Sequence, residues 1–218
     1  MTAAERLSVA LAHHPARLDL AALAIAELDD DPAEPTEVLA LLDRWGAQVA
    51  ARARGSAYAG LDALEGLLVG QLALEGDRDD YDHPHNSFLP RVVARRRGLP
   101  IALAVIYLEV ARRADLPLFG VALPGHFVVA YRMGETATVV IDPFERARLL
   151  DRTDLVAMVA RAGARWSPSL LTPATPLEIA RRMLRNLVGS YHRRGDHAKL
   201  AAAMALLEAI AQDPALMN

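Results

Sequence analysis

The sequence predicts an α+β fold that is mostly helical, with a buried central helix packed against a small antiparallel sheet. Apolar residues in the first half recur at helical spacing, so this half is expected to form several helices. The segment 101–108 is apolar on every side, as in a helix at the centre of a core. After Asp115 the chain is rich in β-branched and aromatic residues, broken by Pro-Gly and Met-Gly, which is typical of short strands and turns.

Four helices are expected before residue 75. Thr2 and Glu5 fit a capping box at the start of the first helix. An apolar stripe over residues 20–28 marks the second, and Pro35 opens the third at a position where proline costs little. A fourth helix is expected over about residues 58–74.

A polar, aperiodic loop over residues 75–85 leads into a short fifth helix. Asn86 or Ser87 is expected to cap this helix, because short polar side chains accept hydrogen bonds from the free N–H groups of a first turn. The arginines at 95–97 suit the negative end of the helix dipole, and Gly98 is expected to stop the helix.

The central helix is expected to start at Pro100 and to run to about Ala114. Strands are expected at residues 118–123, 126–132 and 136–142. Together they predict a three-stranded antiparallel sheet packed on the central helix.

The last third of the chain is again helical in pattern. A short helix is expected over residues 151–162, and two longer ones over about 177–194 and 196–211. The last two resemble one tetratricopeptide unit of about 34 residues, which cannot bury its own apolar face and so should dock on the main body. We therefore divide the chain into a domain of residues 1–165, which includes the N-terminal helices, and a linker with a docked hairpin over 166–218.

Charge and cysteine content limit the function. The net charge of −3 and the pI near 6.2 give no general attraction to nucleic acid or anionic membranes and are compatible with a protein or peptide partner. The absence of cysteine excludes disulfides, thiolate metal sites and cysteine nucleophiles. Residues 1–12 lack the apolar core of a secretory signal, and the most apolar segment, 99–108, is well short of the ~20 residues that span a membrane. We expect a cytoplasmic protein, and the single lysine, Lys199, indicates a GC-rich, bacterial gene.

His126 and Asp142 form the candidate site. They lie eight positions either side of Gly134, so a turn there would place them directly opposite each other in an antiparallel pair, with Cβ atoms about 4.5–5.5 Å apart. At that spacing the carboxylate can orient the imidazole, as in nucleophile–His–Asp systems. A buried polar pair without catalytic use is the alternative interpretation.

Metal binding is not expected. The acidic loop that begins at Asp77 fails the EF-hand pattern, because its sixth position is Asp82 and its twelfth is Phe88. His83 and His85 alternate like strand neighbours, but the sequence identifies no further zinc ligands beside them. We predict neither a metal nor a cofactor.

Four segments, taken in order, carry a resemblance to a known family. They resemble the transglutaminase-like domain of the SirB family, over about residues 20–150, and the C-terminal hairpin resembles that family's tetratricopeptide-like tail. The segments are Tyr81-Asp82-His83-Pro84-His85-Asn86-Ser87, Arg97-Gly98-Leu99-Pro100-Ile101-Ala102-Leu103, Pro124-Gly125-His126-Phe127 and Ile141-Asp142-Pro143-Phe144.

The resemblance implies a site without its nucleophile. In the wider transglutaminase-like and papain-like superfamily, a catalytic cysteine opens the central helix, whose N-terminus lowers the thiol pKa. Here that place falls at about Pro100, and residues 98–118 contain no Ser, Thr or Cys. His126 and Asp142 would remain as a residual dyad, with Asn86, Pro100 and Gly125 near the rim of a polar pocket.

The resemblance therefore favours a non-catalytic, protein-binding or regulatory component, since the SirB family is linked by name to regulation of bacterial invasion genes. The alternative is a hydrolase or amidotransferase-like enzyme, a peptidase or amidase, in which His126 acts as a general base toward water or an unidentified nucleophile. A scaffold whose active surface is the C-terminal hairpin is a third possibility.

Overall fold

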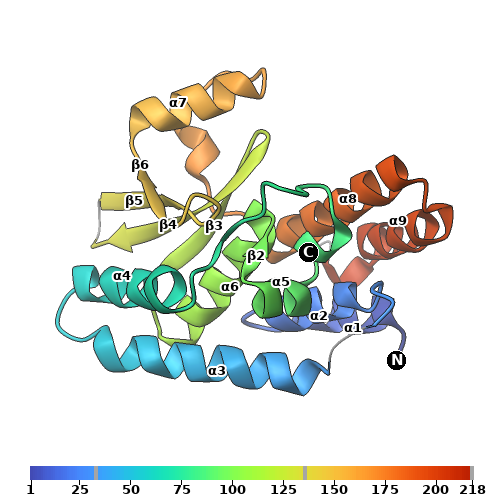
Figure 1. Cartoon of the computed structure of the whole chain (residues 1–218), viewed down its shortest axis with the longest axis horizontal. Coiled ribbons are helices and arrows are strands. Elements are labelled where there is room, and N and C mark those ends of the chain that lie inside the picture. Colours follow the sequence, from blue (N-terminus) through green and yellow to red (C-terminus); the bar gives the residue numbers. More distant parts are fainter. Residues whose placement is uncertain (32–33, 135–136, 217–218) are drawn as a thin grey trace.

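The computed structural model describes residues 1–31, 34–134 and 137–216 (Figure 1). Helices and strands follow one another in the predicted order, and the fold is α+β and mostly helical. The main elements are α1 (Ala3–Ala12), α2 (Leu18–Ala26), α3 (Pro35–Arg52), α4 (Ala57–Glu65), β1 (Glu75–Gly76), α5 (Leu89–Arg95), β2 (Arg97–Gly98), α6 (Pro100–Arg113), β3 (Leu118–Leu123), β4 (His126–Met133), β5 (Ala137–Asp142), β6 (Arg148–Leu150), α7 (Arg152–Arg161), α8 (Pro176–Arg194) and α9 (His197–Gln212).

The helix α6 lies at the centre of the molecule, as predicted. Every residue from Pro100 to Ala111 is buried. The helix packs against β3 and β4 on one side and against α3 on another, with further contacts to α2, α5 and α8. An all-round apolar sequence is stable only in such a position, because each of its faces needs an apolar neighbour.

The main sheet has four antiparallel strands in the order β3-β4-β5-β6 within the described residues, one more than predicted. The additional strand, β6, has three residues, too few to show an alternating pattern in the sequence. Residue 136, where the third strand was expected to begin, lies outside the described residues. The segments β1 and β2 form a separate two-residue parallel pair.

Both faces of this sheet are covered. In β4, Phe127, Val129 and Tyr131 belong to the core around α6. The alternate residues Val128 and Ala130 belong to a second core that includes side chains of α7. Figure 1 accordingly shows α7 on the side of the sheet away from α6. The burial of both faces explains why β4 reads as a continuous apolar run.

The N-terminal half confirms three helices and corrects details of the others. Thr2 and Glu5 form the predicted capping box, and Pro35 opens α3. The fourth helix ends as an α-helix at Glu65 and continues as a π-helix over Gly66–Gln71, instead of running as one helix to residue 74.

The ends of α5 differ from the prediction. Neither Asn86 nor Ser87 caps this helix; Phe88 is its N-cap residue and makes no side-chain cap. Arg96 takes the left-handed conformation after the helix (φ 62°), while Gly98 lies in β2. Packing explains the glycine, because a Cβ at Gly98 would lie 2.7 Å from Val92 Cγ2.

The helices α8 and α9 pack against each other and on the N-terminal helices, through α8·α2 and α9·α1 contacts. Their buried side chains join the core around α6, as Leu187, Tyr191 and Ile210 show. Gly195, which lies between the two segments predicted as helices, separates them in the left-handed conformation (φ 70°). In the part of the chain that the structure describes, no helix is both long enough and apolar enough to cross a bilayer.

Candidate functional site

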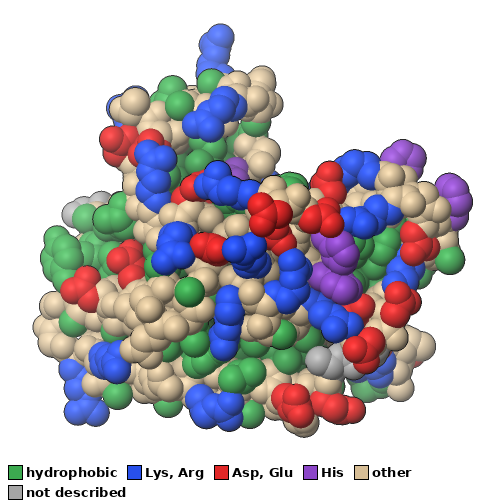
Figure 2. All heavy atoms as spheres, viewed as in Figure 1, with side chains coloured by type: hydrophobic (Ala, Val, Ile, Leu, Met, Phe, Trp, Pro, Cys, Tyr) green, Lys and Arg blue, Asp and Glu red, His purple; other side chains and the backbone are tan. Residues whose placement is uncertain are grey.

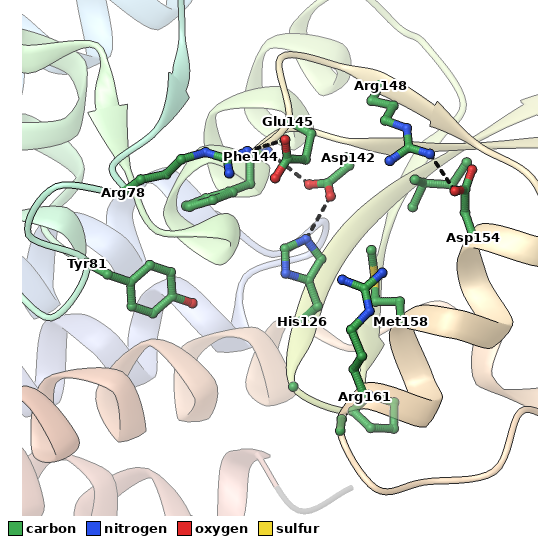
Figure 3. A pocket seen from close by; sticks show the side chains of 14 residues that line it. Arg78, Tyr81, His126, Asp142, Phe144, Glu145, Arg148, Asp154, Met158 and Arg161 are labelled. Carbon is green, nitrogen blue, oxygen red and sulfur yellow. Dashed lines mark hydrogen bonds and ion pairs between the residues drawn. The ribbon is translucent and has the colours of Figure 1, made fainter.

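A cavity of about 520 Å³ opens between the sheet, α7 and the loop that follows β1 (Figure 3). Ionisable and aromatic side chains from segments far apart in the sequence meet in it. Its lining residues are Arg78, Tyr81, Pro124, Gly125, His126, Asp142, Phe144, Glu145, Arg148, Leu150, Asp154, Met158, Arg161 and Ala162.

A tight turn brings His126 into this cavity. His126 is the first residue of β4 and pairs with Leu123 at the end of β3. Pro124 and Gly125 complete the turn, and Gly125 adopts a positive φ of 71°, which favours glycine. A Cβ at Gly125 would lie 3.0 Å from Ala162 Cβ, so the turn also lies close to the end of α7.

His126 and Asp142 are in contact, but not in the predicted register. Val129 is opposite Ile141 in β4 and β5, so continuing this register puts Asp142 beside Val128. The two site residues are therefore diagonal neighbours, displaced by two positions. A two-residue displacement keeps both side chains on the same face, because side chains alternate along a strand.

The contact is a hydrogen bond of 2.9 Å between His126 Nε2 and Asp142 Oδ2. Asp142 is 1% exposed, and its Oδ1 accepts a hydrogen bond of 3.0 Å from the backbone N–H of Phe144. The carboxylate is thus fixed from two sides. In the neutral ring it keeps the proton on Nε2 and leaves Nδ1 as an acceptor.

His126 Nδ1 has no hydrogen-bond partner among the described residues, and the side chain is 17% exposed. Figure 3 shows the ring between Asp142 and the space in front of Tyr81. Phe144 stands edge-on to the imidazole, with ring centroids 6.1 Å apart, and Tyr81 stands edge-on to Phe144 at 5.8 Å. An oriented imidazole with one free nitrogen can bind a ligand or act as a general base.

Ion pairs flank this aromatic group. Arg78 pairs with Glu145, and Arg148 pairs with Asp154 at the start of α7. Arg161, at the other end of α7, forms no ion pair among the described residues. Figure 3 shows it reaching from α7 toward the cavity beside Met158.

Asn86 and Pro100 do not line the cavity in the described part of the chain; Gly125 does. Pro100 is buried in the first turn of α6. Asn86 is fully buried, and its Nδ2 donates to the carbonyl oxygens of Asp80 (2.7 Å) and Tyr81 (3.3 Å). Its Oδ1 accepts from Arg95 at 2.8 Å. Asn86 therefore fixes the loop that carries Tyr81 to the site.

The cavity lining contains no Ser, Thr or Cys among the described residues. The same described residues contain no cluster of three or more His, Asp or Glu side chains that suits a metal ion. His83 and His85 lie together elsewhere, with rings 4.4 Å apart, and His83 Nδ1 accepts from the backbone N–H of His85.

No pattern in the sequence indicated that α7 would form one wall of the cavity. Tyr81 and Phe144 stand inside the segments that carry the family resemblance. In the sequence, nothing distinguishes Met158 and Arg161 from other residues of an exposed helix, or Arg148 from other residues of the segment before that helix. Only the packing of Leu155 and Val159 on the sheet turns their neighbours toward His126.

Comparison with known proteins gives one family. A family model described as the transglutaminase-like superfamily matches residues 36–185. A UPF0162 protein of Xylella fastidiosa strain 9a5c is 41% identical over 135 residues, which cover 59% of this chain and 48% of that protein. A UPF0162 protein of Pseudomonas aeruginosa is 33% identical over 182 residues, which cover 81% and 66%.

A eukaryotic protein is also similar over part of its length. Human F-box only protein 21 is 30% identical over 142 residues, which cover 62% of this chain and 22% of that protein. No solved structure matches. The chain spans about half the length of the Xylella relatives and about two thirds of the Pseudomonas one.

Proposed function

Because this chain belongs to the transglutaminase-like superfamily, we propose that it is a non-catalytic member, of the SirB family, that binds a protein or peptide segment in the cavity around His126 and Asp142. In this proposal the protein is a cytoplasmic, regulatory component. Residues 166–218 act as a tetratricopeptide-like tail to the domain of residues 1–165.

One observation carries the proposal: an oriented His–Asp pair opens into a cavity whose described lining residues include no Ser, Thr or Cys. The chain holds no cysteine, and proline occupies the first turn of α6, where the resemblance implies the nucleophile. The family's usual thiol chemistry therefore has no reacting atom in this chain.

The cavity has the properties of a binding site. Its volume of about 520 Å³ falls within the range of about 300–1,000 Å³ that organic ligands occupy. Tyr81, Phe144 and Met158 offer apolar surface, and His126 offers a polar atom with a fixed orientation. This combination suits a peptide in an extended conformation, with one side chain in the cavity and the neighbouring backbone amides beside it.

A pull-down from a bacterial lysate tests the proposal. The full chain is compared with His126→Ala and with His192→Ala, a control at an exposed histidine on α8. We expect the control to retain the partner set of the unmodified protein and His126→Ala to lose part of it. Equal partner sets for all three proteins, at equal thermal stability, would refute binding at this cavity.

A second candidate function rests on His126 Nδ1. Since the bond to Asp142 uses Nε2, the other ring nitrogen is free to take a proton from water, as in a peptidase or amidase. A positioned general base contributes about 10²–10⁴-fold to a rate. Hydrolysis of an amide-substrate panel that disappears in His126→Ala and persists in His192→Ala would establish this alternative over the binding function.

A further inference from the structure

We infer that the cavity takes a carboxylate group of its peptide ligand, and that Arg161 binds this group beside His126. The inference rests on the proposed function and names the chemical class of its ligand. Three observations carry it: the hydrogen bonds already made by the cavity carboxylates, the position of Arg161, and the charge next to Tyr81.

The acidic side chains of the cavity already have donors. Asp142 accepts from His126 and from the backbone N–H of Phe144. Asp154 binds Arg148 through Oδ1 and the backbone N–H of Asp151 through Oδ2. Glu145 binds Arg78. A cationic ligand would have to compete with these contacts.

The donors of the cavity are not all used. Arg161 carries five N–H groups, and none of them has an acceptor in the described residues. Its exposed side chain lines the cavity, where a planar guanidinium can bind a carboxylate through two parallel hydrogen bonds. Burial raises the pKa of the Tyr81 hydroxyl, which therefore stays protonated at neutral pH and can donate a further hydrogen bond.

A second cation, Arg182, is close enough to act on Tyr81, although it is not among the residues that line the cavity. Arg182 of α8 donates to the carbonyl oxygen of Leu123 at 2.9 Å and lies over the Phe127 ring, 5.7 Å from its centroid. It has no carboxylate partner among the described residues, and its charge acts on Tyr81. Partial burial of an unpaired guanidinium is unfavourable, and a nearby anion reduces that cost.

The charge pattern outside the cavity does not favour a general anion surface. On the face in Figure 2, basic and acidic side chains are intermingled, so they largely compensate each other. The attraction should therefore act at short range, on a carboxylate that enters the cavity. This favours a specific peptide over a polyanion.

Fluorescence anisotropy with four pools of labelled peptides tests the inference and identifies the source of the carboxylate. One pool has a central Glu and an amidated C-terminus. A second has Gln in its place and a free C-terminus. A third has both carboxylates, and a fourth has Gln and an amidated end. The proteins are the unmodified chain, Arg161→Gln and Arg152→Gln, a control at an exposed arginine at the far end of α7.

We expect at least one carboxylate pool to bind on the order of tenfold more tightly than the neutral pool, the size expected for a charge-assisted bidentate contact. Arg161→Gln should remove this preference without abolishing binding of the neutral pool, and Arg152→Gln should keep it. Equal affinities for all four pools, or an unchanged preference in Arg161→Gln, would overturn the inference while leaving the peptide-binding function in place. Failure of every pool to bind the unmodified chain would overturn both.

Discussion

His126 and Asp142 form a hydrogen bond of 2.9 Å although they are not opposite each other in the paired strands β4 and β5. The imidazole reaches diagonally across the sheet to a carboxylate that is itself fixed by the Phe144 backbone. This geometry leaves Nδ1 facing the cavity, so the function of the site depends on which ring nitrogen carries the proton.

Asp142→Asn should invert the tautomer of His126. The new amide can still accept from Phe144 N–H, but its NH₂ group would then face the ring, and Nε2 must become an acceptor. The ¹⁵N chemical shifts of the neutral imidazole, measured by NMR, report the tautomer directly. Asp154→Asn is the control, since Asp154 lines the cavity but binds Arg148. Retention of Nε2–H in Asp142→Asn would show that Asp142 does not orient the ring.

Gly125→Ala should destabilise the fold more than Gly134→Ala. Both glycines have a φ above 70°, so both substitutions cost about 1–2 kcal/mol of backbone strain. Only at Gly125 would the new Cβ also meet another side chain, 3.0 Å from Ala162 Cβ; at Gly134 nothing described lies within 4 Å. Urea unfolding of the two variants measures the difference. An equal loss of unfolding free energy would mean that α7 moves freely away from the turn.

Asp19→Ala should cost about 1.5–3 kcal/mol of unfolding free energy, because it removes a buried carboxylate that accepts charge-assisted hydrogen bonds from two arginines. Arg113 keeps its contacts with Glu109 and Asp43, so its charge retains partners. Asp19 is fully buried and accepts hydrogen bonds from Arg17 and from Arg113 of α6. Asp43 also binds Arg113, but its side chain is 68% exposed, so Asp43→Ala should change the free energy by less than about 1 kcal/mol. Similar costs for the two variants would contradict the difference expected from burial.

The lowered pKa of Asp19 also predicts that the fold loses stability in acid. Burial alone raises the pKa of Asp19, but hydrogen bonds from Arg17, Arg113 and the Leu20 backbone outweigh it and lower the pKa from 3.8 to about 2. The stability that Asp19 contributes is thus fully present above pH 3.8 and is lost as the pH falls through about 2. Melting temperatures from pH 5 to pH 2 should fall more steeply for the unmodified protein than for Asp19→Ala.

His83 and His85 predict a second loss of stability, which begins as the pH falls below about 6.5. Burial, and then the charge of Arg194, lower the pKa of His83; burial, and then His83, lower the pKa of His85. The unfolded chain takes up these protons at about pH 6.5, before the folded one, so stability declines as the pH falls below 6.5 until the folded pKa values are reached. His83→Gln/His85→Gln should flatten this part of the melting curve against pH. If the slope of melting temperature against pH is unchanged in this variant, the loss of stability is caused by other titrating groups.

The order of the elements was predictable from the sequence because it depends on local spacing. The central helix follows from the all-round apolar run that begins at Ile101, and the ends of β3 at Leu118 and Leu123 follow from flanking turns. The proximity of His126 and Asp142 also follows, since a turn near Gly134 keeps both on one face in any register displaced by an even number.

Packing between distant segments decided the rest, because backbone and side chains take the conformation that their neighbours allow. It placed the left-handed residue at Arg96 instead of Gly98. Asn86 came to bind the loop that carries Tyr81, and Arg161 of α7 came to line the cavity, as a result of the same packing. The spacing of apolar residues along the sequence indicates which face of an element each side chain occupies. Which distant residue it contacts is decided only when the elements pack together in the folded core.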